Sequence, residues 1–121
     1  MTVEQTSTPQ QFLETQVSLL EAGDTAGLSM RYAPDATFAR LDGVWRGRAE
    51  IKRLFDDYLR RNPKITAMDG VQLTEDTILY QAAEVLDGVL CTAVGTLVFR
   101  DGQVWRQSVA FVPDRPTPPN G

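Results

Sequence analysis

The chain contains no histidine and a single cysteine, Cys91, among its 121 residues. Histidine is the side chain that most often serves as general base, proton shuttle and metal ligand near neutral pH. With one thiol and no imidazole, the sequence excludes a zinc site of the usual nitrogen and sulfur ligands. We therefore expect neither metal nor cofactor, and any proton transfer must use a carboxylate, a tyrosine, a lysine or bound water. One cysteine also excludes a disulfide framework, which favours a reducing, cytoplasmic location.

Long apolar runs and an excess of positive charge are lacking too. No run approaches the 18 or so apolar residues of a membrane helix, and the polar start MTVEQTSTPQQ lacks the order of a signal peptide. Twelve basic and 16 acidic side chains give a net charge of -4, so no basic stripe for a phosphate backbone is present. These features exclude nucleic acid and membrane as partners and leave a small molecule.

The first half of the sequence has the apolar spacing of helices, and each helical stretch lies between a start and a stop signal. The first predicted helix begins at Thr8 and Pro9 and ends at Gly23. The second begins after Asp24 and carries Leu28 and Tyr32. The third begins after Gly47 and ends at Asn62 and Pro63.

From residue 65 the pattern is typical of strands joined by tight turns. Asp-Gly pairs occur at 42–43, 69–70, 87–88 and 101–102, and each is a turn signal. The strands are predicted near 65–73, 77–86, 89–100 and 103–112. Helices followed by strands predict an α+β domain over residues 9–112, in which three helices pack on a curved antiparallel sheet around a conical cavity. Residues 1–8 are expected to be flexible, and the proline-rich residues 113–121 to be disordered.

Several predicted strands are apolar on both faces. One face can line the cavity, so the other is available to cover a second subunit. Leu90, Val94 and Val98 lie on that outer side. We therefore expect a homodimer that forms through the outer face of the sheet.

The order of elements resembles the nuclear-transport-factor-2-like superfamily and, within it, the SnoaL-like proteins, over roughly residues 9–112. The similar segments are EAGDTAGLSMRYAPDATF, GVWRGRAEIKRLFDDY and the hairpin FRDGQV. The resemblance implies a ketosteroid-isomerase-type cone with a deep apolar pocket, usually in a dimer. It does not imply one activity, because the superfamily includes isomerases, cyclases, epoxide hydrolases and non-catalytic modules.

The positions of the ketosteroid isomerase machinery hold other residues here. The oxyanion-donating tyrosine falls at Gln16, the general-base aspartate at Arg40 and the protonated aspartic acid at Gly95. A supporting tyrosine remains as Tyr32, and its partner position holds Phe55. The resemblance therefore implies that the chain is not a ketosteroid isomerase of the known type.

The catalytic residues of the other enzymes of the superfamily are also mostly absent from this sequence. The aspartate–arginine–aspartate set of limonene-type epoxide hydrolases falls at Glu84, Ala82 and Val109, so one carboxylate of the set remains. The SnoaL cyclases use an acid on the sheet, with histidine in some members, and their acid has no counterpart on the last strand.

Strand alternation places Glu84 inward, opposite Cys91 and on the same face as Tyr80. In an apolar cavity the pKa of Glu84 would rise toward the range useful for a general acid or base. Phe38 and Arg40 also point inward, and the Arg40 guanidinium could hold Glu84 ionised or bind an oxyanion. Alternatively, Glu84 and Arg40 form a structural ion pair, or either points to solvent.

The last strand is predicted to point Trp105, Gln107, Val109 and Phe111 inward, unless a bulge at Asp101 and Gly102 reverses the register. Gln16 and Gln107 either orient a carbonyl or a water, or satisfy backbone groups. The predicted catalytic residues are Glu84 and Arg40, and the predicted ligand-binding residues are Gln16, Tyr32, Phe38, Trp45, Phe55, Tyr80, Trp105 and Gln107.

Two functions remain open on the sequence. The first is a small-molecule isomerase, cyclase or hydrolase that acts on an apolar, oxygenated substrate, in which Glu84 moves the proton and Arg40 or Gln16 holds the oxyanion. The second is a non-catalytic ligand-binding or dimeric association module.

Overall fold

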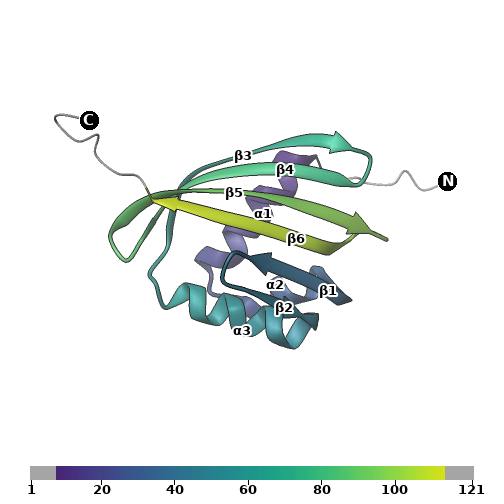
Figure 1. Cartoon of the computed structure of the whole chain (residues 1–121), viewed down its shortest axis with the longest axis horizontal. Coiled ribbons are helices and arrows are strands. Elements are labelled where there is room, and N and C mark those ends of the chain that lie inside the picture. Colours follow the sequence, from purple (N-terminus) through teal and green to yellow (C-terminus); the bar gives the residue numbers. More distant parts are fainter. Residues whose placement is uncertain (1–7, 114–121) are drawn as a thin grey trace.

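The computed structural model describes residues 8–113, which fold as three helices against one face of a curved six-stranded sheet (Figure 1). The predicted α+β architecture is confirmed. Of the predicted flexible start and proline-rich tail, only Thr8 and Pro113 lie inside the described residues. The elements are α1 Pro9–Glu21, α2 Thr25–Met30, β1 Tyr32–Arg40, β2 Gly43–Arg46, α3 Gly47–Leu59, β3 Lys64–Thr74, β4 Thr77–Leu86, β5 Val89–Arg100 and β6 Gln103–Pro113.

Helix α1 begins at the predicted capping residue. The Thr8 hydroxyl accepts a hydrogen bond from the Gln11 backbone N–H at 3.1 Å, and the Gln11 side chain accepts one from the Thr8 N–H at 3.0 Å. This reciprocal pair satisfies donors that the first turn would leave unbonded. The helix then runs behind the strands in Figure 1 and buries Phe12, Leu13 and Gln16 against the sheet.

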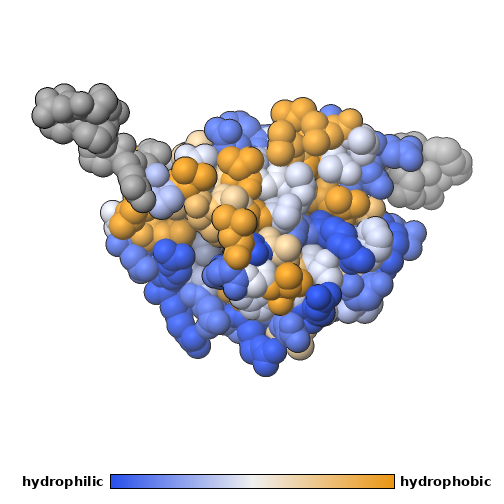
Figure 2. All heavy atoms as spheres, in the orientation of Figure 1, coloured by the Kyte–Doolittle hydropathy of each residue, from blue (hydrophilic) through white to orange (hydrophobic). Residues whose placement is uncertain are grey.

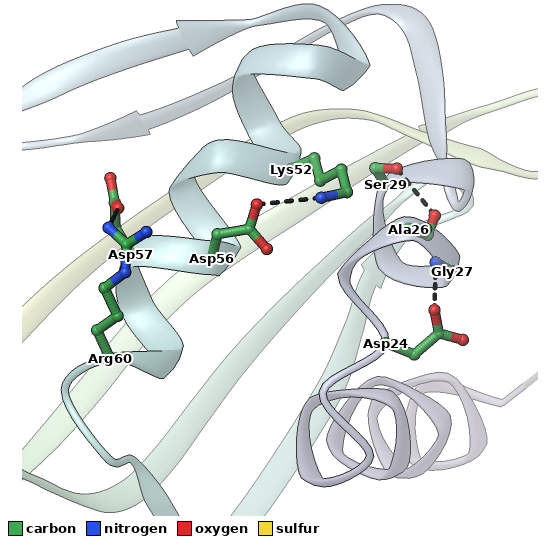
Figure 3. A network of polar contacts seen from close by, with 8 residues as sticks. All are labelled: Asp24, Ala26, Gly27, Ser29, Lys52, Asp56, Asp57 and Arg60. Carbon is green, nitrogen blue, oxygen red and sulfur yellow. Dashed lines mark hydrogen bonds and ion pairs between the residues drawn. The ribbon is translucent and has the colours of Figure 1, made fainter.

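Short-range polar contacts stabilise α2 and α3 at the surface (Figure 3). The Asp24 carboxylate accepts from the Gly27 N–H at 2.9 Å and caps α2. On α3, Lys52 pairs with Asp56 at 3.1 Å and Arg60 with Asp57 at 2.6 Å. The two aspartates therefore belong to the outer side of α3. Helix α2 ends at Met30, so the prediction that it includes Tyr32 is wrong, and Tyr32 is the first residue of β1.

Three of the four Asp-Gly pairs lie at turns between antiparallel strands: residues 42–43 join β1 to β2, and residues 87–88 and 101–102 form the two predicted hairpins. Asp87 and Gly88 have φ angles of 51° and 80°, and Asp101 and Gly102 have 54° and 79°, the positive values that suit the twist of adjoining strands. The prediction of a turn at residues 69–70 is wrong, because both residues lie inside β3. A Cβ at Gly70 would lie 2.6 Å from Cδ1 of Leu13, so glycine there allows α1 to approach the sheet.

The strand order is β2-β1-β6-β5-β4-β3. Neighbouring strands are antiparallel except β1 and β6, which are parallel, so the sheet is mixed rather than purely antiparallel as predicted. The reason is that no hairpin joins these two strands, and a tight turn sets strand direction only between sequence neighbours. The parallel pair brings Phe38 of β1 opposite Gln107 of β6.

A bulge near the second hairpin changes the expected position of Trp105. Val98 pairs with Arg106, whereas Phe99 pairs with Val104, so Trp105 is the extra residue on β6. Val104 is fully buried. The Trp105 ring instead contacts the guanidinium groups of Arg100 and Arg106, at 4.9 Å and 3.9 Å from the ring centroid.

No helix within residues 8–113 has both the length and the apolar content that crossing a bilayer would require. The cytoplasmic location stays a prediction.

The outer face of the sheet, opposite α1, is rich in exposed apolar side chains. Val71 of β3 is paired with Leu79 of β4, and both are exposed. Val94 and Leu90 of β5 and Val112 of β6 are exposed as well, and Figure 2 shows apolar residues gathered over these strands. Burying such a surface against a second copy would remove it from water.

The homodimer therefore stays a prediction with a defined surface. We expect a sedimentation mass of twice 13.4 kDa at micromolar concentration. Val94→Glu should give the mass of one chain, because it would bury two like charges in the interface. Leu41→Glu is the matched control, because Leu41 is exposed in the β1–β2 turn. A single-chain mass for the unaltered protein would contradict the prediction.

Candidate ligand-binding and catalytic site

A cavity of about 70 Å³ lies among α1, α3 and the inner face of the sheet. Its walls are mostly apolar, with Leu13 of α1, Leu54 of α3 and Leu97 of β5 among them. A cavity needs roughly 10–15 Å³ to hold one water molecule, so this cavity has room for a small ligand. The predicted site residues that line it are Gln16, Phe38, Arg40, Phe55, Tyr80, Glu84 and Gln107.

Glu84 is the acidic residue of this cavity. It lies on β4 opposite Cys91, as predicted, and is 3% exposed. Its Oε1 accepts a hydrogen bond of 2.6 Å from the Tyr58 hydroxyl. Burial raises the pKa of Glu84, and the Tyr58 hydrogen bond and the positive charge of Arg61 oppose that rise. Burial also raises the pKa of Tyr58, so Tyr58 keeps its proton and donates.

Arg40 also lines the cavity, but it is bonded elsewhere. Its guanidinium donates two hydrogen bonds to Asp42, at 2.9 Å and 2.8 Å, and stacks over Trp45 at 4.6 Å. Within residues 8–113 Glu84 has no ion pair, so the predicted Arg40–Glu84 pair does not form. Asp42 lies two residues further along the same turn and presents both carboxylate oxygens to the planar guanidinium.

A second polar group borders the cavity on the side of α1. Arg31 donates to Gln16 at 2.9 Å, and Gln16 donates to the Tyr32 hydroxyl at 3.3 Å. Tyr32 donates to the Gln107 amide oxygen, and the Gln107 amide nitrogen donates to the Tyr80 hydroxyl at 2.8 Å. The two glutamines therefore bond to side chains and not, as one alternative had it, to backbone groups.

The aromatic rings of Phe38 and Phe55 form one wall of the cavity. Phe55 packs against Phe38 and Tyr32, each at 5.9 Å between ring centroids. Tyr32 is fully buried behind this wall and reaches the cavity through Gln107. Trp45 and Trp105, both predicted to bind ligand, are absent from the residues that line the cavity.

Gly95 of β5 leaves the space in which the Tyr80 hydroxyl lies. The two residues are paired across β4 and β5, and an added Cβ at position 95 would lie 2.6 Å from the Tyr80 hydroxyl oxygen. It would also lie 2.1 Å from the Ser108 carbonyl oxygen. The Tyr80 hydroxyl thus fills the space into which a side chain from position 95 would project.

No protein-family model and no curated protein matches the sequence. Solved structures do match the fold. A protein of unknown function from Cytophaga hutchinsonii, described as NTF2-like, superposes with a TM-score of 0.71 at 15% identity, over 90% of this chain and 94% of that one. The chain has the nuclear-transport-factor-2-like fold.

Two further structures with this fold are similar. A candidate polyketide cyclase from Sinorhizobium meliloti matches with a TM-score of 0.67 at 20% identity, over 76% of this chain and 86% of that one. A protein with a ketosteroid isomerase-like fold from Catenulispora acidiphila, in complex with trimethylamine, matches with a TM-score of 0.68 at 14% identity, over 84% and 85%. The solved structures that share this fold thus include a candidate polyketide cyclase and a protein with a ketosteroid isomerase-like fold.

Two residues that bond to members of the candidate site, Tyr58 and Arg31, were not predicted from the sequence. Tyr58 fits the apolar spacing of α3, so its pattern did not distinguish a hydroxyl directed at Glu84 from a core ring. Arg31 caps the end of α2, where no periodicity applies. Among residues 8–113 no group of three or more acidic, cysteine or histidine side chains is placed to hold a metal ion.

The raised pKa of Glu84 predicts how stability depends on pH. Below the ordinary glutamate pKa, Glu84 is protonated in both the folded and the unfolded chain. As pH rises from there to the raised folded pKa, the unfolded chain loses its proton first, so the unaltered protein loses stability. Glu84→Gln removes this loss. We therefore expect the variant to gain in unfolding free energy relative to the unaltered protein as the pH rises above the ordinary glutamate pKa.

Urea unfolding at several pH values checks this expectation. Glu21→Gln, which changes an exposed glutamate on α1, is the control and should track the unaltered protein. A difference between Glu84→Gln and the unaltered protein that stays constant or shrinks with rising pH would contradict the raised pKa.

Proposed function

We propose that the cavity binds a small, mostly apolar molecule that carries an oxygen, and that Glu84 exchanges a proton with it. The observation that carries this proposal is the Glu84 carboxyl group, which is 3% exposed, has no ion pair with any residue from 8 to 113 and lies in a mostly apolar cavity. Burial raises the pKa of Glu84 toward the pH at which a general base works best.

The simplest reaction for this arrangement is enolisation of a ketone. The ionised Glu84 takes a hydrogen from the carbon next to the carbonyl as a proton. The electron pair of that carbon–hydrogen bond forms the carbon–carbon double bond of the enolate, and the negative charge moves to the carbonyl oxygen. Returning the proton to the same or a neighbouring carbon completes an exchange or an isomerisation. Tyr58 fixes Glu84 by its hydrogen bond.

The size and polarity of the cavity support a small ligand. The Catenulispora acidiphila protein with the same fold is described in complex with trimethylamine, a molecule of four non-hydrogen atoms. The Sinorhizobium meliloti protein is described as a candidate polyketide cyclase, and polyketides are rich in carbonyl groups. The trimethylamine complex agrees with a small ligand that is apolar around one polar atom, and the cyclase description agrees with a ligand that carries a carbonyl group.

Arg40 has a different role in this proposal from the catalytic role predicted from the sequence. Its side chain is 20% exposed and pairs with the exposed Asp42, so it borders both the cavity and the solvent. We assign it to the entry of the cavity, where it orients an oxygen on the incoming ligand.

A second candidate function is binding without catalysis. It is favoured by the residues at the positions that correspond to the isomerase machinery, which are Gln16, Arg40 and Gly95. None of the three is an acid, and Arg40 is already paired with Asp42. In this case the cavity holds its ligand and Glu84 serves only to accept a hydrogen bond from it or from Tyr58.

Deuterium exchange separates the two functions. Cyclopentanone in heavy water is followed by proton NMR, which measures both binding and the loss of hydrogens next to the carbonyl. Under the catalytic proposal the protein accelerates that loss above the buffer rate at a pH where Glu84 is ionised. Binding with exchange at the buffer rate would reject catalysis and leave the binding function.

A further inference from the structure

Five side chains form an unbroken hydrogen-bonded chain from the protein surface to the cavity. It begins at the half-buried Arg31 and continues through Gln16 and Tyr32 to Gln107 and Tyr80. The participants come from α1, the end of α2, β1, β6 and β4. Such a chain can carry the influence of a surface charge into a site that the charge does not touch.

The direction of every hydrogen bond in this chain follows from its first member. A guanidinium has donors only, so the Gln16 amide oxygen must face Arg31 and its nitrogen must face Tyr32. Tyr32 then accepts from Gln16 and donates to the Gln107 oxygen. This leaves the Gln107 nitrogen to donate to the oxygen of Tyr80. The orientation of a glutamine amide is normally assigned from its surroundings, and here the cation decides it.

The Tyr80 hydroxyl therefore accepts a hydrogen bond from Gln107, and its own proton has no acceptor among these five side chains. Tyr80 lines the cavity and is 5% exposed, and no acceptor for this proton occurs among the hydrogen bonds of residues 8–113. Burial raises the pKa of Tyr80, so the hydroxyl stays protonated at neutral pH. A buried hydroxyl without an acceptor destabilises the folded protein, and a ligand that supplies the acceptor removes that cost.

We propose that Tyr80 is the hydrogen-bond donor of this cavity, that its direction is set by Arg31, and that the ligand carries a matching acceptor oxygen of the carbonyl or enolate type. The proposal rests on the proposed function and names its ligand class. Hydrogen bonds in a chain polarise one another by roughly 10–30% per bond, so the Tyr80 proton is a better donor than an isolated phenol. Developing negative charge on a carbonyl oxygen would be stabilised there.

A pair of probes of the same shape tests the use of this donor. Cyclopentanone labelled with carbon-13 at the carbonyl offers an acceptor oxygen, and methylenecyclopentane replaces that oxygen by a methylene group. We expect Tyr80→Phe to lower ketone affinity about fivefold, the usual scale of one neutral hydrogen bond, and to leave hydrocarbon affinity unchanged. The downfield shift of the bound carbonyl carbon should be lost as well. An equal effect on both probes, or none, would overturn the proposal.

The role of Arg31 is tested by substitution at the far end of the chain. Arg31→Gln gives Gln16 a neighbour that can accept as well as donate, so the direction is no longer imposed, and ketone affinity should fall while hydrocarbon affinity stays. Arg31→Lys keeps a cation with donors only and should restore ketone affinity. Arg53→Gln, which removes an exposed arginine of α3, should have no effect. Unchanged ketone affinity in Arg31→Gln would refute the assignment to Arg31.

The direction can also be read without any ligand. In nitrogen-15 spectra, Tyr80→Phe should move one side-chain amide proton of Gln107 upfield, because that proton loses its acceptor. If the hydrogen bonds ran the other way, Tyr32→Phe would move that proton and Tyr80→Phe would not, and this result would overturn the proposal.

Repeating the probe titrations in Glu84→Gln separates the role of Tyr80 from that of Glu84. Glu84→Gln should abolish deuterium exchange, and the preference for the ketone over the hydrocarbon should remain. Failure of both probes to bind would reject the small-molecule function, and the amide spectrum would still decide the direction.

Discussion

Glu84→Gln is expected to slow deuterium exchange into cyclopentanone by about a hundredfold or more, the scale usual for a general base. Glutamine has nearly the same shape as glutamate, and its amide can still accept the hydrogen bond that Tyr58 donates to Glu84. It cannot take a proton from carbon. Ketone affinity should therefore change little while the exchange rate falls toward that of buffer. Glu21→Gln on the exposed side of α1 is the matched control.

The pH dependence of exchange provides a second reading of the same residue. Because the ionised form of Glu84 is the base, the rate should rise with pH until it passes the raised pKa of Glu84 and then level off. Tyr58→Phe removes a hydrogen bond that favours the ionised form, so the midpoint of this rise should move to higher pH. A rate that is independent of Glu84, or that falls as pH rises, would remove Glu84 from the reaction.

Phe55→Ala is expected to cost about 3–5 kcal/mol of unfolding free energy, the range for removing a buried phenylalanine ring. Phe55 is 5% exposed and lies between Phe38 and Tyr32. Native domains are stable by about 5–15 kcal/mol in total, so the variant should unfold at much lower urea. The deleted ring would join the existing cavity and enlarge it.

The enlarged cavity makes this loss partly reversible. An apolar cavity of about 150 Å³ binds benzene, and a ligand that binds only the folded chain stabilises it by mass action. We expect benzene to raise the urea midpoint of Phe55→Ala. Phe99→Ala is the matched control, because Phe99 packs against Phe12 at 4.9 Å and does not line the cavity. It should lose stability without rescue, and equal rescue of both variants would contradict this account of the wall.

Local signals in the sequence predicted much of the fold. The hairpins at Asp87 and Asp101 follow from turn chemistry, and the first of them fixes the register that places Glu84 opposite Cys91. Once that register is known, alternation identifies the inward residues of β4 and β5. What local signals omit is pairing between distant segments. The parallel contact of β1 with β6 is of this kind.

The site shows the same division. Glu84, Tyr80 and Gln107 were found because alternation within a strand identifies the face a side chain occupies. The hydrogen-bond and ion-pair partners of these residues were not predicted, because they depend on how close different helices and strands lie in the folded chain. Arg40 was expected to point inward within reach of Glu84, and it bonds to Asp42 instead. The bulge that displaces Trp105 depends on how β5 and β6 twist together, and no residue pattern within β6 reports it.

The glycine at position 95 has a consequence for how such a site can change. A carboxylic acid placed there, as the resemblance to the isomerases would have it, needs the space that the Tyr80 hydroxyl occupies, and its Cβ would also meet the Ser108 carbonyl oxygen of β6. A side chain at position 95 therefore requires both that the Tyr80 hydroxyl leaves this space and that the backbone of β6 moves away. Gly95 thus ties the position of Tyr80 to the close approach of β5 and β6, and a single substitution at position 95 cannot convert this arrangement into that of the isomerases.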